Sequence, residues 1–189
     1  SAYYYYQQSL NQYSKADHFG GMVLNLINLG DLLIEMKLYQ EAEEYLDEAL
    51  KLSEPRSENL RIAQVYLYKS DIRSENNKKY EAVALLEKSL EIAKGVNKID
   101  LLVSIYERLS DRYSDINNFS KALEYYKLFK IESDKLTAEK NSNKMLEIQF
   151  ENQKAKELKE KEILLEKEEA QTNLFITIAV AFAVLAIVL

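Results

Sequence analysis

The stretch LGDLLIEMKLYQEAEEYLDEAL, residues 29–50, decides the fold. Leu29, Leu33 and Met36 recur at spacings of three and four, and the same spacing resumes at Tyr39 and continues through Leu46. This spacing is typical of the apolar face of an amphipathic helix. The stretch therefore predicts two helices joined by a short turn, and an all-α fold.

The same pattern recurs along the chain at a constant distance, the repeat interval, which separates Ala42 from Ala82 and Ala82 from Ala122. Four columns share this interval: Ala42, Ala82 and Ala122; Gly30, Ser70 and Ser110; Asp31, Asp71 and Asp111; and Leu46, Leu86 and Tyr126. The later units have Asn76-Asn77 and Asn117-Asn118 at the break, where Asn commonly replaces Gly in a left-handed helix end. Because one hairpin cannot bury its apolar face alone, the units are expected to stack.

Residues 29–50, 79–93 and 108–126 together resemble the tetratricopeptide-repeat family. The resemblance implies a solenoid of helical hairpins whose first helices line a concave surface. The chain departs from the family pattern in its lack of Trp and in its period, which exceeds the usual ~34 residues. Lys69 and Arg73 stand where the other units have Leu29 and Leu33 or Leu109 and Tyr113, so the register of that helix stays open.

Composition excludes several classes of function. The chain has 189 residues, four Gly, one Pro, no Cys and a single histidine, His18, with a formal net charge of −6. No cysteine-based or two-histidine metal site can form, and an acidic chain offers no basic surface for nucleic acid. No phosphate-binding loop or nucleophile motif is present. We therefore expect no enzyme, no cofactor, no metal and no nucleic-acid partner within these residues, and we interpret His18 as an ordinary helix-start or surface residue.

The C-terminal third has a different character. A charged segment at 132–173, without Gly or Pro, predicts a long connecting helix, and its approximate seven-residue apolar stripe is interrupted by Glu151, Glu162 and Glu169. Parallel dimerisation through this stripe and a solvated single helix both remain open. Residues 174–189, LFITIAVAFAVLAIVL, carry no charge and predict a transmembrane helix.

The predicted membrane helix and the first repeat both look incomplete. Sixteen residues at about 1.5 Å each reach roughly 24 Å, short of a hydrocarbon core of about 30 Å. We therefore expect the sequence to end inside the span, and to begin inside a repeat. The predicted organisation is a partial unit at 1–17, full units at 18–57, 58–97 and 98–131, the connecting helix at 132–173 and the truncated membrane helix at 174–189.

Acidic residues form the candidate binding site. Asp31, Asp71 and Asp111 each follow the small residue of a first helix, and one turn later come Glu35, Glu75 and Asp115. If the first helices line the groove, as the resemblance implies, these six carboxylates form an acidic ladder that would bind a cationic peptide or protein segment. The alternative is that they only solvate the surface or pair with neighbouring Lys and Arg. We interpret Glu41, Glu43 and Glu44 as a solvated helix face.

The order of the segments resembles bacterial tetratricopeptide-repeat sensor proteins, in which a histidine-kinase or DNA-binding module follows the span. This resemblance implies the sensory part of a single-pass receptor in the cytoplasmic membrane, with periplasmic repeats, a peptide or protein ligand and lipid as partners. In such a receptor the long helix would transmit a change in orientation or dimer packing through the span, while the homodimer itself stays open. The alternative is a tail-anchored cytoplasmic adaptor whose repeats recruit a client protein.

Overall fold

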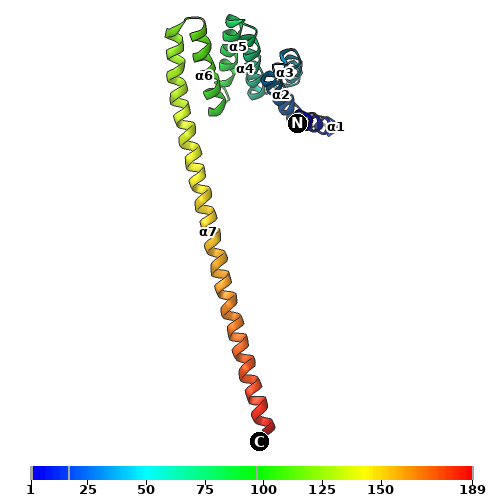
Figure 1. The fold of residues 1–189 in the computed structure, drawn as a ribbon, viewed down its shortest axis with the longest axis vertical. Coiled ribbons are helices and arrows are strands. Elements are labelled where there is room, and N and C mark those ends of the chain that lie inside the picture. The colour runs from blue at the N-terminus through cyan, green and yellow to red at the C-terminus, as the bar shows by residue number, and fades with distance from the viewer. Residues whose placement is uncertain (1, 17, 97, 189) are drawn as a thin grey trace. The chain divides into compact units, whose positions relative to one another are not determined.

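The computed structural model describes residues 2–16, 18–96 and 98–188, with side chains through residue 174 and at 176. The described residues contain helices and no strand, which confirms the predicted all-α fold (Figure 1). The helices are α1 (Ala2–Lys15), α2 (Phe19–Glu35), α3 (Tyr39–Ser53), the 3₁₀ turn η1 (Glu54–Arg56), α4 (Asn59–Glu75), α5 (Lys79–Ala93), α6 (Ile99–Asp115) and α7 (Phe119–Val188).

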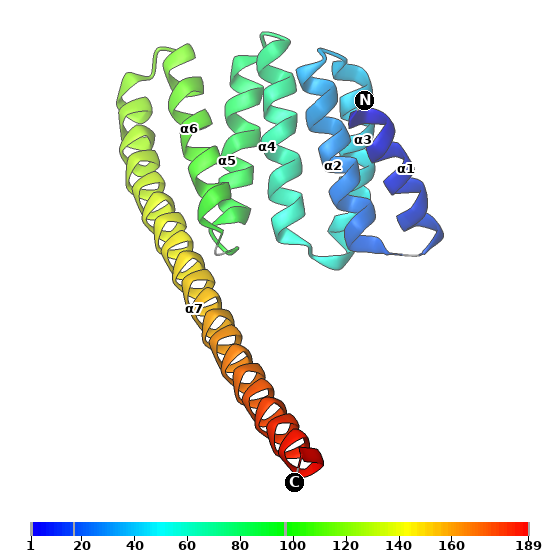
Figure 2. The same ribbon diagram turned by 60° about the horizontal axis from the view of Figure 1, so that its bottom comes forward.

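The helices from α2 onward form stacked hairpins. First helices begin at Phe19, Asn59 and Ile99, and second helices begin at Tyr39, Lys79 and Phe119, so both sets keep the repeat interval. Figure 2 shows these hairpins side by side, with α1 beside α2. The predicted helical-hairpin solenoid is therefore confirmed.

The first helices line the inner side of the stack. α2 contacts α4 and α4 contacts α6, whereas the second helices α3 and α5 are separated by α4. A stack in which one row of helices touches and the other is spread apart curves toward the touching row. The face of α2, α4 and α6 that points away from the second helices is therefore the candidate groove.

The core is built from two clusters of buried side chains that meet at α4. One cluster contains the first hairpin together with Val65 and Ile72 of α4. The other contains the later hairpins together with Ala63 and Leu67 of the same helix. α4 thus contributes its opposite faces to the two halves of the core.

The repeat columns occupy equivalent core positions in the first two hairpins. Ala42, Leu46, Ala82 and Leu86 are all fully buried. In the last hairpin the hydroxyl of Ser110 donates to the backbone carbonyl of Ala122 at 3.1 Å, which keeps the small-residue contact between the two helices. Tyr126 departs from its column, because its side chain is 50% exposed.

The turns inside the hairpins are also equivalent. Lys37, Asn77 and Asn117 all have left-handed backbone, with φ of 62°, 60° and 59°. In each turn the next residue donates its amide to the carbonyl five residues back, as Leu38 does to Leu33 at 2.8 Å. This is the Schellman arrangement that the two asparagines predict. Lys37 shows that the first hairpin adopts the same turn without a favourable residue.

Replacing Lys37 by glycine is expected to stabilise the chain by about 0.5–1 kcal/mol, since a side chain in the left-handed region is strained and glycine relieves that strain. Urea unfolding followed by circular dichroism measures the change. The matched control is Lys51→Gly in the last turn of α3, where glycine is expected to destabilise by about 1 kcal/mol. Equal losses for both variants would contradict the prediction.

Lys69 and Arg73 keep the register of α4 through ion pairs with α3. Arg73 donates from Nη1 to Glu43 at 3.0 Å and from Nε to Glu81 of α5 at 3.2 Å. Lys69 pairs with Glu43 at 3.5 Å and with Asp47. The register of α4 is therefore the same as that of α2: charged side chains replace the leucines of the first hairpin, and they form ion pairs with charged partners. Our interpretation of Glu43 as a solvated residue is wrong.

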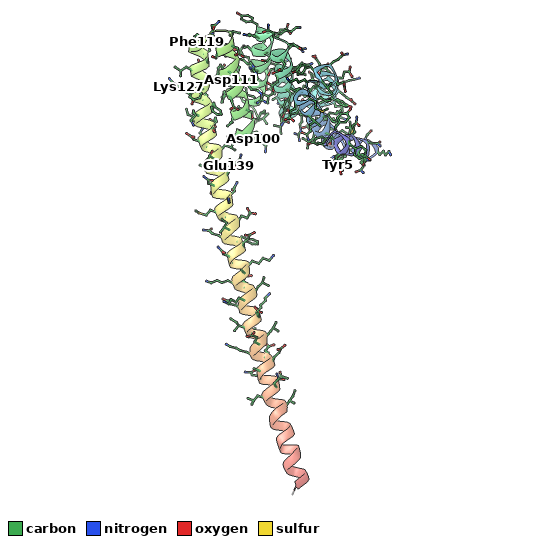
Figure 3. The ribbon with its side chains drawn as sticks, viewed as in Figure 1. Tyr5, Asp100, Asp111, Phe119, Lys127 and Glu139 are labelled. Atoms are coloured by element: carbon green, nitrogen blue, oxygen red, sulfur yellow. The ribbon has the colours of Figure 1, made fainter. Side chains whose placement is uncertain are left out.

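The chain divides into two compact units, residues 1–137 and 138–189. Beyond Thr137, α7 continues as a helix (Figure 3). Its described apolar side chains are exposed, among them Met145, Leu146 and Phe150. The residues whose side chains the structure describes contain no helical stretch of the length and apolar character that crossing a membrane requires. The predicted span at 174–189 lies outside those side chains apart from Leu174 and Ile176.

Candidate functional site: the groove of the first helices

A polar cluster crosses the three first helices in the candidate groove. Asp31 of α2 lies beside Tyr68 of α4, and Asp71 of α4 is paired with Arg108 of α6. The Nε of Arg108 donates to both oxygens of Asp71, at 3.1 and 3.0 Å. The structure thus brings two of the predicted carboxylates together, and it adds a tyrosine and an arginine to them.

Burial governs the ionisation of this cluster. Burial raises the pKa of Asp31, although a hydrogen bond with Tyr68 acts in the opposite direction. Burial also raises the pKa of Asp71 and outweighs the favourable charge of Arg108. The same burial, together with the charge of Asp31, raises the pKa of Tyr68 to about 12. Both carboxylates are therefore held in surroundings that disfavour their charged form.

The remaining four predicted site residues are exposed and lie outside this cluster. Glu75 accepts a hydrogen bond from the hydroxyl of Tyr39 at 3.0 Å. Asp115 pairs with Arg112 at 3.0 Å. Glu35 and Asp111 have no hydrogen bond or ion pair with any other residue that the structure describes. Part of the predicted ladder is thus neutralised by arginines of α6, and Glu35 and Asp111 keep unpaired charge.

The pattern of carboxylates in the sequence does not identify Tyr68 and Arg108, because neither residue is acidic. They occupy one repeat column, in which the first unit has Asn28, and this column lies one helical turn before Asp31, Asp71 and Asp111. Residues one turn apart share a helix face. The repeat interval therefore contained the signal that identifies both residues.

A pocket of about 280 Å³ lies next to this cluster, between α4 and the beginning of α6. Its apolar wall is formed by Leu60, Leu67 and Leu101. Its polar lining is formed by Arg61, Gln64, Tyr68, Lys98, Asp100 and Ser104. Figure 3 labels Asp100 and Asp111 toward opposite ends of α6, so the pocket and the unpaired carboxylate Asp111 lie at different ends of the groove.

The chemistry available in this groove is binding by charge and hydrogen bonds. No group of three or more acidic or histidine side chains that could hold a metal ion occurs in the described part of the chain. His18 caps α2, where its Nδ1 accepts a hydrogen bond from the backbone amide of Gly21 at 3.0 Å. This confirms its interpretation as a helix-start residue.

Comparison with known proteins supports the class of the fold. The family model described as Tetratricopeptide repeat matches residues 21–95. Regulatory protein RapG of Bacillus subtilis (strain 168) is 30% identical over 116 residues, which cover 61% of this chain and 31% of the relative. The crystal structure of BtubC (BKLC) from P. vanneervenii aligns with a TM-score of 0.60 at 19% identity, covering 72% of this chain and 57% of that chain.

Residues 21–95 are therefore similar to tetratricopeptide repeats, in agreement with the helical-hairpin solenoid that the structure describes. The chain spans about a third of the length of its regulatory relative. The solved structure, at its low identity, supports the fold alone.

Proposed function

We propose that the chain is the ligand-binding part of a membrane-anchored bacterial signalling receptor, with a basic peptide or extended protein segment bound in the groove of α2, α4 and α6. The observation that carries this proposal is the row of carboxylates along these helices: burial disfavours the ionisation of Asp31, and the exposed Glu35 and Asp111 form no ion pair with a described residue. Ionisable side chains whose burial lowers the stability of the folded state are typical of functional sites, where stability is exchanged for activity. The relation to a regulatory protein is consistent with a signalling role.

A basic ligand would gain most from the carboxylates that are still without partners. Glu35 and Asp111 are exposed and unpaired within the described residues, whereas Asp71 is already occupied by Arg108. A lysine or arginine of the ligand can pair with these free carboxylates and share Asp31. Charge pairing of this kind sets specificity and on-rate, and it weakens as salt screens it.

Binding of fluorescent decapeptides tests the groove. The wild-type chain is expected to bind a Ser/Gly decapeptide with three lysines more tightly than its three-glutamate counterpart, with an affinity that falls as salt rises. Glu35→Gln with Asp111→Asn is expected to weaken binding of the lysine peptide about tenfold, because charge-assisted contacts are lost. The matched control is Glu139→Gln, an exposed carboxylate on α7. Binding unaffected by salt and by the double variant would contradict the proposal.

Asp31→Asn separates a binding role from a structural one. Because burial disfavours the charged form, the variant is expected to have an unfolding midpoint at pH 7 equal to or above that of the wild type, while the lysine peptide binds more weakly. The raised pKa means that the penalty is present at neutral pH and disappears as pH falls toward 3.8, the ordinary pKa of aspartate. The difference in unfolding midpoint between the variant and the wild type is therefore expected to vanish near that pH. A lower midpoint for the variant at pH 7 would make Asp31 a structural residue.

Membrane attachment through residues 174–189 belongs to the same proposal, and the uncharged run in the sequence supports it. The chain is expected to float with vesicles of phosphatidylethanolamine and phosphatidylglycerol. Ala179→Lys with Ala183→Lys is expected to abolish flotation, because each lysine at the centre of a span opposes insertion by about 2.5–3.5 kcal/mol. Ala155→Lys with Ala170→Lys is the matched control. A reporter fused after Leu189 is expected on the cytoplasmic side, and an extracytoplasmic signal would contradict the receptor orientation.

A further inference from the structure

The two ends of the groove carry opposite charge. All six predicted carboxylates lie in the second halves of α2, α4 and α6, from Asp31 to Glu35 in the first of these helices and at equivalent positions in the others. The pocket at the other end contains two cationic side chains, Arg61 and Lys98. The intervening Arg108 is held by Asp71. The groove is therefore acidic at one end and basic at the other.

Neither cation of the pocket forms an ion pair with a residue that the structure describes. Arg61 donates to the neutral amide of Gln64 at 3.0 Å. Lys98 has no ion pair among the described residues. The pocket's one carboxylate, Asp100, accepts from the backbone amide of Leu101 at 3.0 Å. Two positive charges against one negative charge leave the pocket with a net positive charge, so it favours an anionic group.

The shape of the pocket favours a carboxylate on a short apolar stem. Leu60, Leu67 and Leu101 provide an apolar wall, and Ser104 and Gln64 add hydrogen-bonding groups beside the cations. A glutamate or aspartate side chain can place its methylene groups against the leucines and its carboxylate between Arg61 and Lys98. A fully hydrated anion such as inorganic phosphate would make no apolar contact with the leucines.

We infer that the groove recognises a dipolar peptide, with an acidic side chain in the pocket formed by Arg61 and Lys98 and a basic side chain at the carboxylates of the opposite end. This inference rests on the proposed function and specifies its ligand. From Gln64 to Asp71 or Glu75 is 7 or 11 helical residues, which at about 1.5 Å each gives roughly 10–16 Å. An extended peptide covers about 3.3 Å per residue, so its opposite charges lie about three to five residues apart.

Three fluorescent peptides of equal length test the inference with the whole chain. One has a lysine and a glutamate four residues apart, the second has the same lysine with glutamine in place of glutamate, and the third has the two charges on adjacent residues. The first is expected to bind about tenfold more tightly than the second and the third, because only it places a charge at each end. The peptide is prepared in both sequence orders, and the tighter order is used.

Variants locate the acidic subsite. Arg61→Gln with Lys98→Gln is expected to remove the preference for the glutamate peptide and to leave binding of the glutamine peptide unchanged. Lys140→Gln with Lys144→Gln on α7 is the control of equal charge, and circular dichroism confirms that both variants fold. Competition with inorganic phosphate and with free glutarate separates a peptide subsite from a general anion site.

The outcomes distinguish this inference from the proposal on which it rests. Equal binding of the glutamate and glutamine peptides, or displacement by phosphate at the concentration of the peptide, would overturn the dipolar ligand and leave a basic ligand standing. Binding of none of the peptides would overturn both. A preference for glutamate that survives in the Arg61 and Lys98 variant would also overturn the assignment of the pocket.

Discussion

Leu46→Ala is expected to lower the free energy of unfolding of the repeat domain by about 2–5 kcal/mol. Leu46 is fully buried in the first core cluster, and its side chain lies against the backbone of Gly30. A Cβ added to Gly30 would come within 2.7 Å of Cγ and Cδ2 of Leu46, so the two helices leave no space for the side chain to move. Alanine would therefore leave a cavity between α2 and α3 that the surrounding helices cannot fill. Urea unfolding followed by circular dichroism measures the loss.

The control for this prediction makes the same substitution on the surface. Leu123 of α7 is 54% exposed, so Leu123→Ala is expected to change the free energy of unfolding by about 0.5 kcal/mol or less. A comparable loss in both variants would show that burial of Leu46 does not determine the stability of the stack.

Glu43→Gln is expected to lower the free energy of unfolding by about 1–3 kcal/mol, since it removes the carboxylate that meets Arg73 and Lys69 between the first and second hairpins. The side chain of Arg73 is 20% exposed and that of Glu43 is 30% exposed, so solvent only partly screens the pair. Glutamine keeps the shape and one hydrogen-bond acceptor and loses the charge. The effect is measured by urea unfolding at pH 7.

The pH dependence of this effect has a defined sign. The hydrogen bond from Arg73 lowers the pKa of Glu43, so the stabilisation is present above the ordinary glutamate pKa of 4.5 and is lost as pH falls below it. Wild type and Glu43→Gln are therefore expected to converge in stability in acid. Glu44→Gln, the exposed neighbour, is the control and is expected to be within about 0.5 kcal/mol of wild type at both pH values. A constant difference at all pH values would exclude the ion pair as its cause.

The sequence predicted the helices well because the repeat interval relates equivalent residues both in the core and in the turns. The columns of Ala42 and Leu46 indicate the buried face, and the asparagines at 77 and 117 indicate the left-handed turns. A single pattern therefore locates the helices, their contacts and their ends. Lys37 adopts the same turn because the contacts of the hairpin around it outweigh its own conformational preference.

The groove was less predictable because its properties depend on contacts between helices. Nothing local distinguishes Asp71, which pairs with Arg108 of α6, from Asp111, which forms no hydrogen bond or ion pair with a described residue. Similarly, Glu43 resembles its neighbour Glu44 in the sequence, and only the position of α4 turns one of them into an ion-pair partner. Charge patterns in one helix identify candidates, while the neighbouring helix decides which charges remain free.

The position of α4 has a consequence for how the domain comes apart. Its two faces belong to different clusters, through Val65 and Ile72 on one side and Ala63 and Leu67 on the other. Unfolding of either half of the domain would remove the side chains that pack against one face of α4. The packing of α4 against the other half would then weaken as well. The hairpins are thus expected to unfold together, as one cooperative unit, rather than one after another.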